Sequence, residues 1–392
     1  MAPFHAESRA GRPSPRVSGH VRAPAPVAAL ACRACSRMAR GKSLIHHVGN
    51  PASSTGPNMT DVSTRPASRH AFVTGGTGFV GLNLIRALID QGWTVTAVHR
   101  VSSDTRYLDE LDITRVPGDI TDAASIQAAM PDNVDAVFHV AGDTNLWSAN
   151  NDRQTRINVE GTRNMLAAAR ARGARRFIHT STISAIGRHD RPVSESTTSN
   201  APQSVINYER SKYAAEQLVR QAGQEGLDTV ILQPGAIMGP FDTATWAQVF
   251  YLLRDGKLAA LPPGAVPLNH VREIVTAHIK AAETASPGSE YVLGGHNVKL
   301  ADLFRRMAGV AGYKAPRMVA PRVVLAGFAA VLATVARVTG KEPDITPEGA
   351  AFMSHDNRAD SAKAERDLGF AATDIDRCVQ DSYDWLTSRG LL

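Results

Sequence analysis

The sequence predicts an α/β protein with a doubly wound parallel sheet and a smaller lobe toward the C-terminus. Three observations support this fold class. From Ala71 onward, short β-branched runs alternate with helical patterns, a glycine-rich turn at Gly75 to Gly81 joins a strand to a helix, and the alternation weakens after Pro234. Strands that alternate with helices in this way indicate a parallel sheet with crossover helices.

The predicted strands are apolar on both faces, as a sheet covered by helices on both sides requires. The strands comprise residues 71–74, 94–99, 136–140, 177–180, 229–233 and 291–293, and the helical patterns comprise residues 80–91, 160–172 and 211–223. We therefore expect a main domain over residues 69–233. Residues 234–392 are expected to form mainly a substrate-binding lobe, from which residues 269–295 return to the main sheet.

Residues 1–68 are rich in Ala, Arg, Ser and Pro and have no sustained apolar period, which predicts a disordered extension. Residues 1–58 are interpreted as a non-native extension ahead of Met59 or as an organelle transit peptide. Residues 1–60 hold eight basic residues and one acidic residue, a net charge of +7. Because the formal net charge of the whole chain is +6, the remaining residues carry a net charge of −1. A basic surface for nucleic acid is therefore not expected on the folded part.

Three cysteines occur, two of them in Cys32-Arg33-Ala34-Cys35, so no disulfide framework and no metal site are expected. A reducing, cytoplasmic compartment is the default. The longest apolar run, from Val323 to Ala336, is shorter than the ~20 residues that a membrane span needs. We expect it to form a buried or lid helix of the smaller lobe, and peripheral membrane contact is the alternative.

The glycine-rich turn has the order of residues that a dinucleotide requires. Gly75 permits a tight turn, Gly78 lets backbone amides approach a pyrophosphate, and Gly81 lets the helix pack close to the strand. The start of the helix supplies unpaired N–H groups for the phosphates. The candidate cofactor-binding residues of this turn are Gly75, Thr77, Gly78, Phe79, Val80 and Gly81.

The ends of the next strands add further candidates. The second strand ends at Arg100 without an acidic residue, which favours NADP(H) over NAD(H), although Arg100 as a plain surface charge is the alternative. Asp119, followed by Ile120, comes after the third strand and is suited to accept from the adenine amino group or to cap a helix. Ala141 and Gly142 are small residues that let a cofactor approach the sheet.

Tyr208 and Lys212 are spaced i and i+4, so they lie on one face of a helix. A tyrosine is a poor acid–base group at neutral pH, and a nearby lysine cation stabilises its phenolate form. Thr182, on the preceding strand end, is placed to hold a substrate carbonyl oxygen while Tyr208 delivers a proton.

From about Ala71 to Leu392 the chain resembles the extended short-chain dehydrogenase/reductase family, also called the NAD-dependent epimerase/dehydratase superfamily. The motifs that carry the resemblance are Thr74-Gly75-Gly76-Thr77-Gly78-Phe79-Val80-Gly81, Gly118-Asp119-Ile120-Thr121, Asn158-Val159-Glu160-Gly161-Thr162, Thr180-Ser181-Thr182, Tyr208 to Lys212, Gln233-Pro234-Gly235 and Ala362 to Phe370. The resemblance implies a Rossmann fold, a catalytic triad of Thr182, Tyr208 and Lys212, a structural role for Asn158, and cofactor contact at Pro234.

Within the family, the segment from Pro234 to Pro240 is similar to the dihydroflavonol-reductase and 3β-hydroxysteroid-dehydrogenase branch. The resemblance implies an NADP(H)-dependent oxidoreductase that interconverts a ketone and a secondary alcohol on a fairly apolar small molecule. The alternatives are a sugar-nucleotide epimerase or dehydratase, since the chain also resembles bacterial proteins named as hopanoid-associated sugar epimerases, and a non-catalytic NADP-sensing protein. A homodimer is compatible with the sequence.

Overall fold

The computed structural model describes residues 69–392, so the predictions for residues 1–68, including Met59 and the Cys32 to Cys35 segment, lie outside the described part. At its centre is a seven-stranded sheet in which all paired strands are parallel. The order is β3-β2-β1-β4-β5-β6-β9, with β1 (His70–Thr74), β2 (Thr94–His99), β3 (Thr114–Pro117), β4 (Ala136–His139), β5 (Phe177–Thr180), β6 (Thr229–Pro234) and β9 (Glu290–Leu293). The predicted doubly wound parallel sheet is confirmed.

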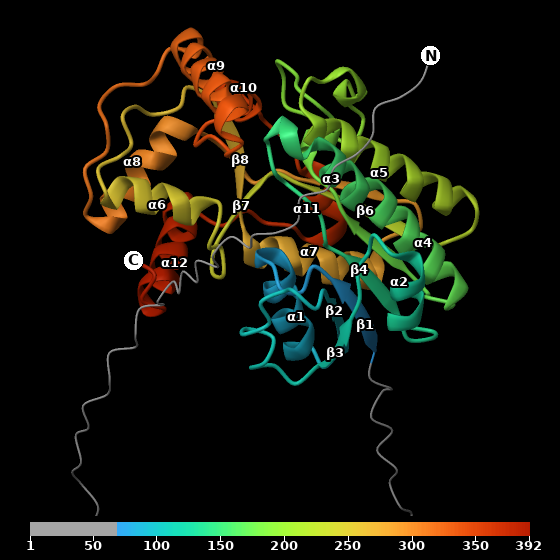
Figure 1. Cartoon of the computed structure of the whole chain (residues 1–392). Coiled ribbons are helices and arrows are strands. Elements are labelled where there is room, and N and C mark those ends of the chain that lie inside the picture. Colours follow the sequence, from blue (N-terminus) through green and yellow to red (C-terminus); the bar gives the residue numbers. More distant parts are fainter. Residues whose placement is uncertain (1–68) are drawn as a thin grey trace, which may run out of the picture. The chain divides into compact units, whose positions relative to one another are not determined.

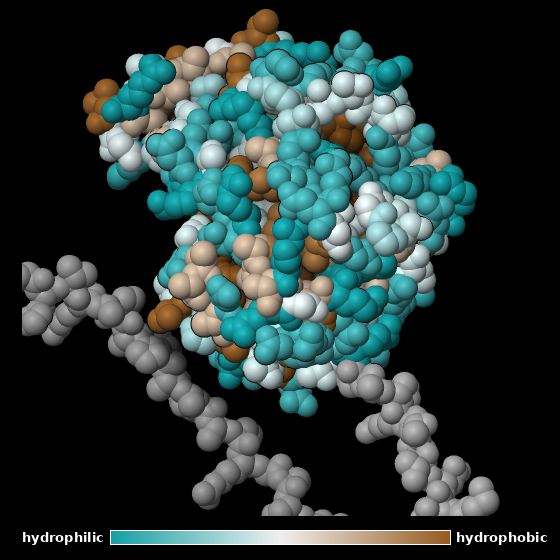
Figure 2. All heavy atoms as spheres, turned by 90° about the vertical axis from the view of Figure 1, so that its right-hand side faces the viewer, coloured by the Kyte–Doolittle hydropathy of each residue, from teal (hydrophilic) through white to brown (hydrophobic). Residues whose placement is uncertain are grey.

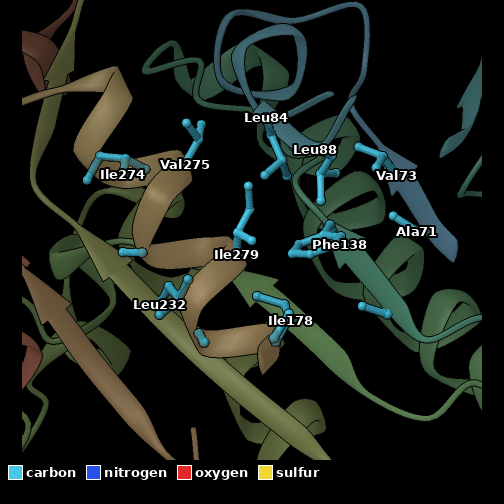
Figure 3. Packing of buried hydrophobic residues seen from close by; sticks show 14 of the residues in the cluster. Ala71, Val73, Leu84, Leu88, Phe138, Ile178, Leu232, Ile274, Val275 and Ile279 are labelled. Atoms are coloured by element: carbon cyan, nitrogen blue, oxygen red, sulfur yellow. The ribbon is translucent and has the colours of Figure 1, made fainter. Parts of the chain in front are cut away.

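Helices cover both faces of this sheet (Figure 1). On one face, α1 (Phe79–Asp90) and α7 (Val271–Thr284) pack on the strands, as Leu84, Ile279 and Phe138 show in Figure 3. On the other face, α2 (Ala123–Ala129), α4 (Gly161–Ala171) and α5 (Asn207–Gln224) form a second core that includes Phe72. Alternate residues of each strand thus enter opposite cores, which is why the strands are apolar throughout.

The chain after Pro234 builds a smaller sheet with the order β10-β8-β7. Its strands are β7 (Ala236–Met238), β8 (Ala265–His270) and β10 (His296–Lys299), and its helices are α6 (Trp246–Arg254), α8 (Leu300–Ala311), α9 (Arg322–Thr339), α10 (Pro347–Ser354) and α12 (Ile375–Ser388). Trp246, Phe250 and Phe304 contribute to a separate core of this lobe. β9 lies beside β6 in the main sheet and α7 packs on α1, while α11 (Ala362–Leu368) packs against α7 and β9.

Two helical segments begin earlier than their predicted bounds. The helix predicted from residue 160 is preceded by α3 (Asn151–Thr155) and by a π-helical turn, η2 (Arg156–Glu160). The helix predicted from residue 211 begins at Asn207, so Tyr208 lies in its first turn. A π-helical turn inserts an extra residue into the helical repeat and is frequent at functional sites. Here it carries the buried Asn158.

The apolar run from Val323 to Ala336 was expected to form a buried or lid helix, and the expectation of burial is wrong. Of α9, only Ala329 and Ala336 are buried, whereas Val331, Val338 and other apolar residues are exposed. By length and composition α9 is apolar enough to cross a membrane, with a mean hydropathy of 1.6 over 18 residues. The apolar residues of this segment therefore face outward, because the lobe's core is already filled by α6, α8 and α12.

Candidate active site

The glycine-rich turn joins β1 to α1 and requires glycine at two positions. Gly75 adopts a φ of +70°, and a Cβ there would lie 2.8 Å from the backbone nitrogen of Ala141. A Cβ on Gly81 would overlap the carbonyl oxygen of Gly75. The turn, the start of α1 and the end of β4 thus approach one another more closely than any side chain would permit.

The start of α1 suits the phosphates of a dinucleotide. Gly78 is the N-cap residue, no side chain caps the helix, and its first turn carries no acidic residue. Gly78 is exposed, and Thr77, Phe79 and Val80 are partly exposed. A helix start with accessible N–H groups and a partial positive charge binds anions. The residues present therefore fit the pyrophosphate of NAD(P).

Other candidate cofactor residues follow neighbouring strands of the parallel sheet. They are Arg100 after β2, Asp119 and Ile120 after β3, and Ala141 and Gly142 after β4. The Ala141 backbone nitrogen donates to the Thr74 hydroxyl at 3.1 Å, which ties the end of β4 to the end of β1. Because parallel strands end at one edge, all these candidates lie along the edge that carries the glycine-rich turn.

Asp119 does not cap a helix, so that alternative is wrong. Its carboxylate accepts from the backbone nitrogen and the hydroxyl of Thr121, at 2.9 and 2.8 Å, and α2 is capped by Asp122 instead. Burial alone would raise the pKa of Asp119, but the hydrogen bonds from Thr121 and the charges of Arg100 and Arg156 hold it below its usual value. Asp119 is therefore an ionised acceptor beside Arg100.

The side chain of Thr182 interacts with Tyr208 and favours the ionised form of the tyrosine. Burial raises the pKa of Tyr208 to about 12, and the interaction with Thr182 offsets part of this rise. The Thr182 oxygen also accepts from the backbone nitrogen of Ser184 at 3.2 Å. Thr182 can then donate its own proton to the Tyr208 oxygen, which leaves the Tyr208 proton available to another acceptor.

Lys212 lies one helical turn beyond Tyr208 and is buried. Its ammonium group donates to the backbone oxygen of Thr180 at 2.8 Å. Burial lowers the pKa of Lys212 to about 8, against an opposing effect of Glu216. Lys212 is therefore held by the end of β5, one helical turn from Tyr208 on the same helix.

A buried histidine fixes the strand end that holds Lys212. His278 on α7 donates from Nδ1 to the Ile274 carbonyl oxygen at 2.7 Å, so its Nε2 accepts from the Thr180 hydroxyl at 2.8 Å. Burial lowers the pKa of His278 to about 4, which keeps the ring neutral at physiological pH. Thr180 is thus held by α7 from one side and binds Lys212 through its carbonyl oxygen.

A second buried network surrounds Glu216, one turn beyond Lys212. Glu216 accepts from Ser181 at 2.5 Å and from Gln233 at 2.9 Å, and it pairs with Arg220 at 2.8 Å. Burial raises the pKa of Glu216 above its usual value, although these partners oppose the rise. Sequence reasoning did not identify this group, because its members come from α5, β6 and the end of β5.

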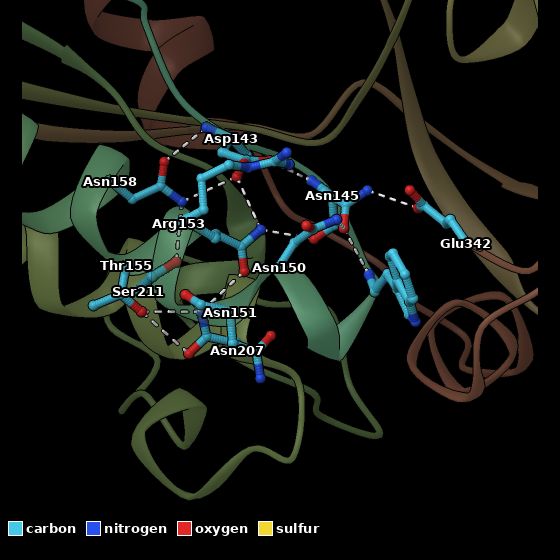
Figure 4. Close-up of polar contacts among 12 residues, drawn as sticks. Asp143, Asn145, Asn150, Asn151, Arg153, Thr155, Asn158, Asn207, Ser211 and Glu342 are labelled. Carbon is cyan, nitrogen blue, oxygen red and sulfur yellow. Dashed lines mark hydrogen bonds and ion pairs between the residues drawn. The ribbon is translucent and has the colours of Figure 1, made fainter. Parts of the chain in front are cut away.

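Figure 4 shows the polar contacts that hold the segment after β4. Asn158, in the π-helical turn, accepts from the Asp143 backbone nitrogen at 2.8 Å and donates to the Asp143 carbonyl oxygen and to Ser211, each at 3.0 Å. Asn207, beside Tyr208, donates to the Gln154 side chain at 3.1 Å. These bonds connect the edge of the candidate cofactor site to the first turn of α5, and Asp143 is a residue that the motifs did not indicate.

The remaining expectations concern Pro234, metals and cysteines. Pro234 is the last residue of β6 and is buried. Within residues 69–392, no cluster of three or more His, Cys, Asp or Glu side chains is arranged to hold a metal ion. Cys378, the cysteine within this range, is buried and free.

This fold and these side chains define an α/β protein of the dinucleotide-binding class. Its Tyr208 and Lys212 lie on one helix, α5, with the spacing used by oxidoreductases of this class. The model of the NAD dependent epimerase/dehydratase family matches residues 71–294, and the chain belongs to this family. The predicted family resemblance is thereby confirmed.

Individual relatives agree with the family. A putative dihydroflavonol 4-reductase of Synechocystis is 34% identical over 81% of this chain and 95% of its own length. A 3-beta-hydroxysteroid dehydrogenase of Mycolicibacterium neoaurum is 28% identical over 80% of this chain and 89% of its own. The chain in the crystal structure of gox2253 is 31% identical in sequence to this chain, and the two structures have a TM-score of 0.73. The match covers 83% of this chain and 100% of the gox2253 chain. The chain is an NAD(P)-dependent enzyme of the extended short-chain type.

Proposed function

We propose that this protein is an NADP(H)-dependent oxidoreductase that interconverts a ketone and a secondary alcohol on a fairly apolar small molecule. The observation that carries the proposal is the arrangement of Tyr208, Thr182 and Lys212. The names of the dihydroflavonol and steroid relatives support an apolar substrate. Bound NADPH would supply the hydride for reduction.

The side chains of this site account for the proton that reduction requires. With a pKa of about 12, Tyr208 stays protonated at neutral pH and is an acid toward a developing alkoxide. A substrate carbonyl oxygen would accept from the Tyr208 hydroxyl, and also from Thr182 when the Thr182 hydroxyl turns from Tyr208 to the substrate; both bonds stabilise the negative charge as it forms. Lys212, charged below pH 8 and buried beside Tyr208, favours the phenolate that remains after proton transfer.

The preference for NADP(H) rests on Arg100. Its side chain is exposed at the end of β2 and forms no ion pair within residues 69–392. The next acidic residue along the chain, Asp104, pairs with Arg106 instead. An arginine at this strand end supports the proposal, because in dinucleotide-binding folds such an arginine accommodates the 2′-phosphate that distinguishes NADP(H) from NAD(H).

Titration of both cofactors tests this preference. NADPH is expected to bind more tightly than NADH, and Arg100→Ala should weaken NADPH by roughly one to two decades, the effect of losing a charge-assisted contact of about 1.5–3 kcal/mol. NADH affinity should stay nearly unchanged. Equal binding of the two cofactors by the wild type, or equal weakening by the variant, would refute the NADP(H) assignment.

A screen of NADPH oxidation tests the activity. Ketones derived from sterols, flavanones and 3-oxoacyl compounds would be compared with nucleotide sugars, at fixed ionic strength. Net oxidation of NADPH with an apolar ketone is expected. Turnover of a nucleotide sugar with retained cofactor and no net oxidation would favour an epimerase. Tight cofactor binding without turnover of any compound would favour the non-catalytic alternative.

A further inference from the structure

One side of α9 presents a continuous apolar stripe. Its members are more than half exposed and recur at alternating spacings of four and three residues, which keeps them on one side of a helix: Val324, Phe328, Val331, Val335 and Val338. The opposite side holds α9 to the lobe, since Ala329 and Ala336 are buried and α9 packs against α10. The stripe therefore cannot turn inward without breaking this packing.

Outside α9, the exposed large apolar residues of the described surface are Val101, Val205, Leu252, Met318 and Val319. The face in Figure 2 is largely hydrophilic, and apolar residues project at its upper edge, the level of α9 in Figure 1. A contiguous exposed apolar strip bordered by polar residues indicates an interaction site.

The charges around the stripe identify its partner. α9 contains no acidic residue, and three exposed cations lie at its start or within eight residues before it: Lys314, Arg317 and Arg322. None of the three forms an ion pair with a carboxylate of residues 69–392, although the charge of Arg322 helps to lower the pKa of Asp356. At the other end, Arg337 and Lys341 are balanced by Glu342 and Asp344. A cluster of cations at one end of an apolar strip complements anionic lipid headgroups.

We propose that α9 docks this protein on the surface of an anionic lipid bilayer, with the stripe at the boundary between headgroups and acyl chains. α9 lies along the bilayer and does not cross it, because the segments after it return to the same fold. Asp356 and Ala359 form bridges with Ala265 and Val193, and Lys363 donates to the Glu290 carbonyl oxygen. A crossing would carry these residues to the other side of the membrane.

The segment that follows α9 is bonded to the candidate active site. Besides the Asn145 to Glu342 contact, visible in Figure 4, the Thr346 hydroxyl donates to the Leu146 carbonyl oxygen at 2.9 Å. Residues 145 and 146 belong to the stretch that continues from Ala141 and Gly142. Docking would thus bring the site close to apolar molecules dissolved in the bilayer. This consequence rests on the proposed function, but the docking itself does not.

Co-sedimentation of the full chain with vesicles tests the proposal. Vesicles of phosphatidylcholine with phosphatidylglycerol are expected to bind the wild type, and pure phosphatidylcholine vesicles should bind it more weakly. Phe328→Asp/Val335→Asp should lower the partition coefficient at least tenfold. Thr387→Asp/Ser388→Asp, which adds the same charge at exposed positions of α12, should lower it less than threefold.

Two further readouts separate the outcomes. NADPH affinity and melting temperature should be the same in both variants, which shows that they fold. Absence of vesicle binding by the wild type overturns the proposal. So does unchanged binding of the α9 variant, which would indicate attachment through the basic N-terminal residues. A dimer in sedimentation velocity that the α9 variant dissociates, without vesicle binding, would assign the stripe to a second copy.

Discussion

Lys212→Met removes a buried ammonium group, and its effect on stability depends on pH. The pKa of Lys212 falls from 10.5 to about 8 on folding because the side chain is desolvated. Between these values the unfolded chain binds more protons than the folded protein, so the fold becomes more stable as the pH rises. The contribution is fully present above the unfolded pKa and is lost as the pH falls through 8.

Between pH 7 and pH 10 this linkage amounts to about 2.5 kcal/mol of unfolding free energy, at about 1.4 kcal/mol per pKa unit. Urea unfolding of the wild type and of Lys212→Met at both pH values measures it. The wild type should gain about 2.5 kcal/mol relative to the variant, since titrating groups that do not interact with Lys212 cancel in the comparison. A relative gain below about 1 kcal/mol would show that Lys212 is not desolvated as the structure describes.

Three further predictions concern the turn, the polar contacts and the N-terminal extension. Gly81→Ala should lower the unfolding free energy by about 1–3 kcal/mol, because the added Cβ would overlap Gly75. Gly309 is a helical glycine with open space around it, so Gly309→Ala is the control and should not lower the unfolding free energy. Equal effects of the two substitutions in urea unfolding would contradict the packing argument. Asn158→Ala should reduce kcat more than tenfold with little change in NADPH affinity, because it releases Asp143 and Ser211; an unchanged kcat would exclude a positioning role. Deleting residues 1–58 should leave melting temperature and cofactor affinity intact, since this segment has no apolar period, and a large drop in either would refute it.

The sequence predicts the central sheet well because each interior strand must be apolar on two faces. The sequence indicates β3 only as the strand before Asp119, without bounds, because β3 is an edge strand and none of its residues is buried. The outward face of α9 was missed for the opposite reason. Apolar composition indicates burial in most helices, and the surroundings that leave α9 exposed are set by tertiary packing.

The motifs of the candidate site are local in sequence, and the groups that support them are not. Tyr208 and Lys212 lie one turn apart, so their shared face follows from helical spacing alone. His278 binds Thr180 across 98 positions of the chain, and Gln233 reaches Glu216 across 17. Such pairs come together only when the sheet and its helices assemble, so periodicity and spacing cannot reveal them.

The central claim is that Tyr208 delivers the proton of a carbonyl reduction, and Tyr208→Phe tests it most directly. Turnover of NADPH with a ketone identified in the substrate screen should fall about 10²–10⁴-fold, the usual contribution of a positioned acid. NADPH affinity should stay within about twofold, and Tyr213→Phe on the same helix should keep wild-type turnover. Activity of Tyr208→Phe within about tenfold of wild type would contradict the claim, because another group would then supply the proton.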